Sequence, residues 1–312
     1  MNLEIISAEE YGNICGSYQY FYNSVQFHEL NKNKVSQVKY LLFGEKKKKL
    51  ALVIGIENDE IRIPYSSPFG IFEQLQSHIK LEEVEEAVTL LEEYGKENGI
   101  CKIVFRVPPV FYDECFISKL QNVLLRKGYQ IAYCDLNYQF YIHDMEQYEN
   151  SLLRNARKNL KNAMKQEFSF VHCESVDEKR EAYNVIAENR KRKGYPLRMT
   201  YEQVNDTIQL TEHDFFLLKD GEVSIAAAVI FKVNKECYQV IYWGDIDGYE
   251  AKRPMNYLAY KVYEYYSNMG IKVLDIGPST EEGIPNYGLC DFKESIGCEV
   301  SSKMTYMKKI CD

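Results

Sequence analysis

Hydrophobic and polar positions in the first half of the chain predict strands, then a helix, a strand, a helix and a closing strand. The runs QVKYLLFG, LALVIGIE and EIRIPY are rich in residues typical of strands, and the polar turns GEKKKK and ENDE separate them. The segment 81–99 repeats apolar residues at helical spacing and stops at Gly99. ICKIVFRV predicts a buried strand, ECFISKLQNVLLRKG a second helix, and YQIAYCDLNYQFYI the closing strand.

The second half repeats this order. DFFLLKD, EVSIAAAVIFKV and ECYQVIYWG predict three strands of an antiparallel meander, and a helix is predicted from Pro254 to Gly270. IKVLDIG, NYGLCDFKESIG and CEVSSKMTYMKK then predict a strand, a short helix and a last strand. KENGICKIVF also resembles SNMGIKVLDI, and LLRKGYQIAYCDLNYQFYI resembles ESIGCEVSSKMTYM. We therefore predict a duplicated α/β unit, with a first unit at 1–145 and a second at 146–312.

Composition places the chain among ordinary globular proteins. Its 312 residues are comfortable for two cores, and 46% of them are hydrophobic and 27% charged. No apolar run approaches the ~18 residues that span a bilayer, and the N-terminal residues do not resemble a secretory signal. Nine cysteines without a C-x-x-C motif and five histidines without ligand spacing predict reduced thiols and no metal site. We therefore expect a cytoplasmic protein without an integral membrane segment.

Charge is distributed unevenly along the chain. The net charge of −8 argues against non-specific binding along DNA. Residues 151–198, however, hold twelve basic and only six acidic side chains. A local cationic surface on an acidic protein predicts a specific anionic partner, such as a phosphate group on a ligand.

The order of predicted elements in each half is that of the GNAT acyltransferase fold, and two such units in tandem resemble the Fem-type family of peptidoglycan cross-bridge aminoacyltransferases. Residues 151–164, SLLRNARKNLKNAM, resemble that family's Arg-Arg-Asn-x-x-Lys-Ala stretch, and SSPFG at 66–70 resembles its Pro-Tyr/Phe-Gly loop. Asp275-Ile276-Gly277 resembles its Tyr-Asp-x-Gly strand end, and residues 288–297 resemble its terminal Gly-Leu-x-x-Phe-Lys-x-x-x-Gly motif. The resemblance implies an α/β fold with mixed sheets, in which a degenerate first unit helps to form the acceptor groove. The second unit would hold the acyl-transfer site.

Three residues are candidates for catalysis. In the family the Phe-Lys pair lies beside the end of the acyl donor, so the resemblance implies that Phe292 contacts the donor and that Lys293 stabilises the oxyanion. The alternative for Lys293 is a solvated position on the helix surface. Asp245 and Asp275 lie at predicted strand ends, where a carboxylate can take the proton from an attacking amine. A turn-forming role is equally open for Asp275, because Gly277 and Pro278 follow it.

A second group of residues is predicted to bind substrate. Tyr242 and Trp243 either line the groove or are ordinary core aromatics. The basic helix has either a solvated surface or a surface for the phosphates of a nucleotide-linked acceptor or a tRNA end, through Arg154, Arg157, Lys158 and Lys161. Arg192 and Tyr195, in RKRKGYP, are candidates to hold a diphosphate and to stack on a ring.

Together these features predict an N-acyltransferase that transfers an acyl or aminoacyl group to an amine on an anionic acceptor, by direct attack in a ternary complex. The donor is either acyl-CoA or aminoacyl-tRNA. The stretch DIDGYEAKRPMNYL lacks the paired glycines with which acetyl-CoA enzymes of this fold hold pyrophosphate. Two alternatives remain open: an acyl-CoA-dependent acetyltransferase of sugar amines, and a catalytically inactive tandem-GNAT protein that binds a ligand.

Overall fold

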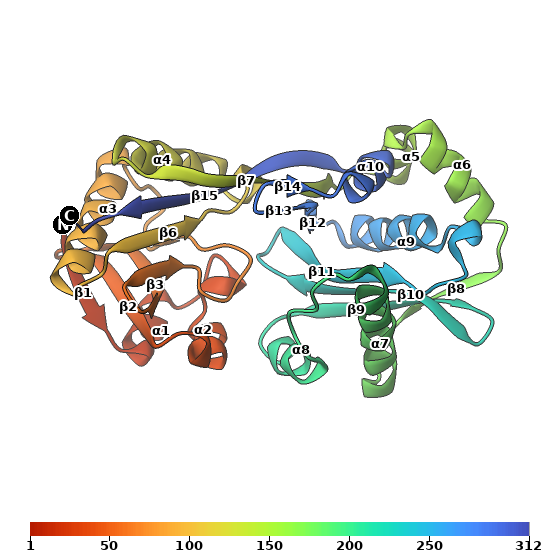
Figure 1. Ribbon diagram of the computed structural model, residues 1–312, viewed down its shortest axis with the longest axis horizontal. Coiled ribbons are helices and arrows are strands. Elements are labelled where there is room, and N and C mark those ends of the chain that lie inside the picture. The colour runs from red at the N-terminus through yellow and green to blue at the C-terminus, as the bar shows by residue number, and fades with distance from the viewer. Residues whose placement is uncertain (312) are drawn as a thin grey trace. The chain divides into compact units, whose positions relative to one another are not determined.

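The computed structural model describes residues 1–311 and divides into two compact units (Figure 1). Unit 1 contains Met1–Leu136 together with the chain from Ser301 onward, and unit 2 contains Asn137–Val300. Each unit is a mixed sheet covered by helices. The predicted α/β fold of two tandem units is therefore confirmed.

Unit 1 is built on strands in the order β1-β2-β3-β4-β6-β15. Neighbouring strands are antiparallel except β4 and β6, which are parallel. The short β5 pairs with β3 outside this order. The strands are β1 Asn2–Ile6, β2 Gln37–Gly44, β3 Lys48–Glu57, β4 Glu60–Ile63, β5 Glu73–Gln74, β6 Lys102–Arg106 and β15 Glu299–Lys309.

The helices of unit 1 include two that the sequence pattern did not predict. α1 and α2 lie in the poorly patterned N-terminal segment, and Ser7 and Ser24 cap them by accepting hydrogen bonds from backbone amides. The SSPFG loop forms a turn in which the Ser67 hydroxyl donates to the Phe69 carbonyl, and Phe69 is buried. The helices are α1 Ala8–Cys15, α2 Val25–Asn31, α3 Leu81–Glu97 and α4 Glu114–Arg126, with 3-10 turns η1 Phe21–Asn23, η2 Lys32–Lys34 and η3 Val110–Tyr112.

Unit 2 has the strand order β7-β12-β11-β10-β9-β8. β11 and β12 are parallel, and the other neighbours are antiparallel. The strands are β7 Gln130–Tyr141, β8 Phe168–His172, β9 His213–Asp220, β10 Val223–Lys232, β11 Cys237–Asp245 and β12 Val273–Pro278, with a separate small hairpin of β13 Thr280–Glu281 and β14 Ile284–Pro285.

Helices cover both faces of the unit 2 sheet (Figure 1). Alternation along β10 shows why: Ala226, Ala228 and Ile230 pack on one face, and Ala227, Val229 and Phe231 on the other. The first face is covered by α6 and α9, and the second by α7 and α8. The helices are α5 Met145–Ser151, α6 Arg154–Ala163, α7 Val176–Lys193, α8 Tyr201–Ile208, α9 Pro254–Met269 and α10 Tyr287–Ser295, with the 3-10 turn η4 Glu250–Lys252.

The two units exchange their closing strands. β7 follows the first half of the chain, but its residues 137–141 pair with β12 of unit 2. β15 ends the second half, but its residues 305–309 pair with β6 of unit 1. The division expected from the sequence, 1–145 and 146–312, treats each unit as one continuous segment and differs from this arrangement. Periodicity identifies a strand, but it does not say which neighbour completes the ladder.

Candidate functional site

The parallel strands β11 and β12 pair only at their beginnings. The ladder joins Cys237–Gln239 to Val273–Asp275 and extends no further in the described chain. β11 continues to Asp245, and between Val240 and Tyr242 it bulges out of register with β10. The β11 backbone beyond Gln239 therefore has no β12 partner on that side, and the N–H groups that point to that side lie outside the β11–β12 ladder.

β12 ends in a bulge that is fixed by the side chain of Asp275. The register with β7 shifts between Asp275 and Gly277, and Gly277 adopts φ +74°. One carboxylate oxygen of Asp275 accepts from the Gly277 amide and from Asn137 Nδ2, both at 2.8 Å. The other accepts from Gln239 Nε2 at 2.6 Å, and Asp275 is buried. The bond from the Gly277 amide is the contact by which an Asx residue forms a turn. The role of Asp275 as a proton acceptor stays a prediction.

The Lys293 side chain is inside the protein, with only 3% of the residue exposed. This burial contradicts the solvated-helix alternative. Its ammonium donates to three successive backbone carbonyls at the end of β12, those of Ile276 at 3.1 Å, Gly277 at 2.8 Å and Pro278 at 3.2 Å. It also lies 5.3 Å from the centre of the Tyr138 ring. Burial lowers the pKa of Lys293 to about 8, although the nearby Cys298 and Asp275 act in the opposite direction.

α10 is placed by contacts at both of its ends. Asn286 caps its first turn by accepting from the Leu289 amide, and the Ser295 carbonyl accepts from the Leu153 amide. Gly297 has φ +87°, and a Cβ there would lie 2.3 Å from the Ser151 hydroxyl. The final glycine of the terminal motif is thus required both by the backbone conformation and by this close approach.

The aromatic candidates lie on two different faces of the sheet. Trp243 contacts Phe292 edge-on, with ring centres 6.2 Å apart, and both pack against the core beneath α9. Tyr242, one residue earlier, points to the opposite face, where its hydroxyl accepts from the Met199 amide at 3.1 Å. The expectation that Tyr242 and Trp243 line one groove therefore does not fit the alternation of the strand.

Asp245 and Arg192 are engaged with each other. Arg192 Nη2 lies 3.2 Å from the Asp245 carboxylate, and Nη1 lies 2.6 Å from Asp247 and 2.7 Å from Glu250. Asn189 also donates to the Asp245 carboxylate at 3.0 Å. The sequence suggested the Arg192 guanidinium as a binder of a diphosphate, but three carboxylates already neutralise its charge. These ion pairs favour a structural role for Arg192, in which it joins α7 to the loop after β11.

Arg190, two residues earlier, was not predicted and has a different environment. Its guanidinium lies 5.4 Å from the Tyr242 ring centre and 5.8 Å from that of Tyr195. The Tyr195 hydroxyl accepts from Asn286 Nδ2 at 2.7 Å, which connects this loop to the start of α10. One signal was available in the sequence: Tyr183, Ile186 and Arg190 follow the spacing of a buried helix face.

The basic helix α6 exposes its cations. Ala156, Leu160 and Ala163 form its buried face. Arg157 donates to the carbonyls of Asn150 and Leu152. Within residues 1–311, no carboxylate pairs with the remaining cations of this surface, which are Arg154, Lys158, Lys161 and Lys165.

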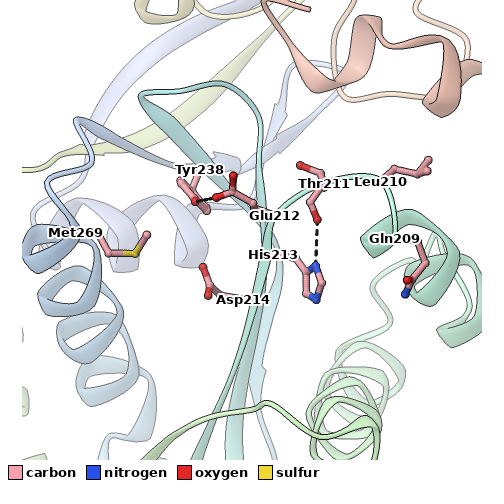
Figure 2. Close-up of a pocket in the computed structure, with 8 residues that line it drawn as sticks. All are labelled: Gln209, Leu210, Thr211, Glu212, His213, Asp214, Tyr238 and Met269. Carbon is pink, nitrogen blue, oxygen red and sulfur yellow. Dashed lines mark hydrogen bonds between the residues drawn. The ribbon is translucent and has the colours of Figure 1, made fainter. Parts of the chain in front are cut away.

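A surface pocket of about 570 Å³ lies at the opposite end of the unit 2 strands, near the start of β9 and the end of α9 (Figure 2). Its polar groups are paired: Tyr238 donates to Glu212 at 3.0 Å, and the buried Asp214 accepts from Tyr266 at 2.6 Å. Because the pocket lies at the opposite end of the strands and Lys293 is not among the residues that line it, it is separate from the site around Lys293. The described residues contain no His, Cys, Asp or Glu cluster suited to a metal, and no described helix has the length and apolar character needed to cross a bilayer.

No family model and no curated protein matches the sequence. Solved structures, in contrast, match almost the whole chain. FemX superposes with a TM-score of 0.71 at 12% identity, covering 99% of this chain and 97% of its own. L-PGS from Bacillus licheniformis gives 0.63 at 13% identity, covering 99% and 94%. A tandem GNAT protein from the clavulanic acid biosynthesis pathway gives 0.52 at 8% identity, covering 100% and 99%. At these identities the likeness establishes the architecture, and the chain has a Fem-like tandem GNAT fold.

Proposed function

We propose that the protein is an N-acyltransferase whose chemistry takes place in unit 2, between the diverging ends of β11 and β12. An amine on an anionic acceptor attacks an activated acyl or aminoacyl carbonyl while both substrates are bound. The new C–N bond replaces the ester C–O or thioester C–S bond of the donor, and the donor leaves as a hydroxyl or thiol that takes up the proton lost by the amine. The single observation that carries this proposal is the buried Lys293 ammonium at the end of β12, in a stretch that resembles the terminal motif of the Fem-type family.

Charge compensation is the role that we propose for Lys293. Attack on an ester or thioester carbonyl creates an oxyanion, and a fixed ammonium in a site shielded from water stabilises that charge strongly. All three N–H donors of Lys293 are occupied by carbonyls, and the bond to Pro278, at 3.2 Å, is the longest. The oxyanion replaces this bond. The unpaired β11 backbone supplies a second donor.

The surroundings of the β11–α9 loop favour a donor other than acyl-CoA. An enzyme that holds pyrophosphate at this loop uses free backbone N–H groups at the start of the helix. Here α9 begins with Pro254, which has no N–H, and Asp247 and Glu250 place two exposed carboxylates nearby. The unpaired cations of α6 suit a polyanion such as the end of a charged tRNA. An aminoacyl donor is therefore our proposal.

The test is a structure obtained after soaking with CoA and, separately, with a UDP-linked muropeptide. We expect acceptor density beside Lys293 and Phe292 and no ordered CoA at the loop before Pro254. Ordered CoA at that loop contradicts the aminoacyl donor and favours the acyl-CoA alternative. Tight binding of an anionic ligand, without amide formation from either donor across a panel of amines, favours an inactive binding protein.

A further inference from the structure

The half-buried Arg190 of α7 has no anionic partner among residues 1–311. Its Nε is buried and has no hydrogen-bond partner. No carboxylate lies within ion-pair distance of it in residues 1–311, in contrast to Arg192 on the same helix. Buried arginines in folded proteins are normally paired, because an uncompensated charge out of water is costly. The burial that lowers the pKa of Arg190 expresses the same cost.

The surroundings of Arg190 have the features of a binding site. The rings of Tyr195 and Tyr242 flank the guanidinium. The Tyr195 hydroxyl accepts a hydrogen bond from the side chain of Asn286, and the backbone amide of Asn286 donates to the Ser279 carbonyl. The Ser279 hydroxyl is itself buried, with 3% of the residue exposed, and has no partner. Two unsatisfied donors therefore belong to one connected set of residues.

This set of residues also adjoins Lys293. Lys293 donates to the carbonyl of Pro278, which directly precedes Ser279 in the chain. The positive charge of Arg190 also acts with burial to lower the pKa of Lys293. Asp275 is a carboxylate whose charge acts on Lys293, and its oxygens already accept from Asn137, Gln239 and the Gly277 amide. Two neighbouring cations with so little internal compensation favour a ligand that brings a negative charge.

We propose that Arg190 binds a carboxylate group of a substrate, through its Nε–H and one Nη–H, with the Ser279 hydroxyl as a further donor. This inference rests on the proposed function, since it places the anionic group of a substrate beside the acyl-transfer site. The Nε edge of a guanidinium presents two parallel N–H groups that match one planar carboxylate. A single guanidinium that offers one such edge suits one carboxylate better than a diphosphate.

The test follows the Arg190 Nε–H signal in a ¹H–¹⁵N spectrum of arginine side chains, assigned by its loss in Arg190→Gln. N-acetylglycine is the probe, N-acetylglycinamide is its neutral match, and inorganic phosphate is the competing oxyanion. We expect N-acetylglycine to shift the Nε–H signal with saturation and the amide to leave it unchanged. Binding observed elsewhere in the spectrum is expected to weaken about ten- to a hundredfold in Arg190→Gln. It is expected to be unaffected in Arg180→Gln, which removes an exposed guanidinium from an earlier part of the same helix.

Thermal melting supplies an independent readout. Because Arg190 has no internal anion, Arg190→Gln is expected to melt at or above the temperature of the unmodified protein, whereas loss of a structural arginine lowers it. Equal N-acetylglycine affinity in Arg190→Gln, a strongly lowered melting temperature, or a response to phosphate alone overturns the carboxylate assignment. None of these readouts requires turnover, so failure of acyl transfer and failure of this site are distinguishable.

Discussion

The Lys293 ammonium donates to the Gly277 carbonyl at 2.8 Å, while the amide of the same Gly277 donates to Asp275 at the same distance. One glycine thus connects two of the three residues that the sequence suggested for catalysis. Its positive φ and the adjoining bulge turn three successive carbonyls toward one ammonium. The end of β12 is a backbone cage for Lys293, and Asp275 fixes the cage.

Replacing Asp275 is therefore expected to affect folding first. In Asp275→Asn the new amide places N–H groups against those of Asn137 or Gln239, so at least one buried donor loses its acceptor. We expect the free energy of unfolding to fall by about 1–3 kcal/mol, measured by urea denaturation. Asp291→Asn, on the exposed side of α10, is the matched control and is expected to have no effect. Unchanged stability with lost turnover instead identifies Asp275 as the proton acceptor.

The depressed pKa of Lys293 predicts a dependence of stability on pH. The folded protein holds the Lys293 proton less tightly than the unfolded chain, in which a lysine titrates near its ordinary value of about 10.4. Between pH 8 and that value the unfolded state binds more protons, so the contribution of Lys293 to the free energy of unfolding rises with pH. Urea denaturation from pH 7 to 9.5 is expected to show this rise in the unmodified protein relative to Lys293→Met. A difference between the two proteins that does not change with pH contradicts it.

Gly297 is expected to tolerate no side chain. Gly297→Ala places a methyl group at φ +87° and against the Ser151 hydroxyl, and we expect a loss of about 2 kcal/mol or more in the free energy of unfolding. Ser151→Ala removes the closest atom but not the backbone strain. The double variant is therefore expected to recover part of the loss. Full recovery of the free energy of unfolding in the double variant, or no loss of it in Gly297→Ala, contradicts this prediction. Either result shows that α10 can shift relative to the α5–α6 junction.

The exposed cations of α6 are expected to bind polyanions. Lys158→Glu with Lys161→Glu is expected to weaken the association with tRNA, because each cation that neutralises a phosphate adds to the salt-dependent binding free energy. Fluorescence anisotropy at several salt concentrations measures both the affinity and its salt slope. Lys46→Glu with Lys47→Glu, at an exposed hairpin tip of unit 1, makes the same change of charge elsewhere. An equal loss of tRNA affinity in both double variants shows that the effect comes from net charge and contradicts a binding surface on α6.

Much of the fold was predictable because each element carries its own period. β2, β3 and β4 coincide with the three runs read as strands, and α3 begins and ends close to the predicted limits. The exchange of β7 and β15 was not predictable, since both read as closing strands of their own halves. β8 and the capped helix α1 lie in segments without a strong apolar period, and α1 depends on the local cap of Ser7.

The site was predicted less completely than the fold. The motif identified Lys293, but only the folded structure shows that its ammonium is buried among backbone carbonyls and is not in water. Within the run RKRK we chose Arg192, although the apolar spacing along α7 singles out Arg190, and the two guanidinium groups meet opposite environments. Arg190 lies on the apolar face of α7, whereas Arg192 reaches the acidic loop after β11, so side-chain direction decides which arginine remains unpaired.

The most direct test of the central claim is amide formation by the unmodified protein and by Lys293→Ala. Labelled aminoacyl-tRNA and labelled acetyl-CoA are offered separately to a panel of amines that carry a carboxylate. The account predicts labelled amide from aminoacyl-tRNA and a loss of about 10²–10³-fold in Lys293→Ala, the scale of losing one oxyanion donor. Lys235→Ala, an exposed lysine of the same unit, is expected to retain full activity. Full turnover by folded Lys293→Ala contradicts the account.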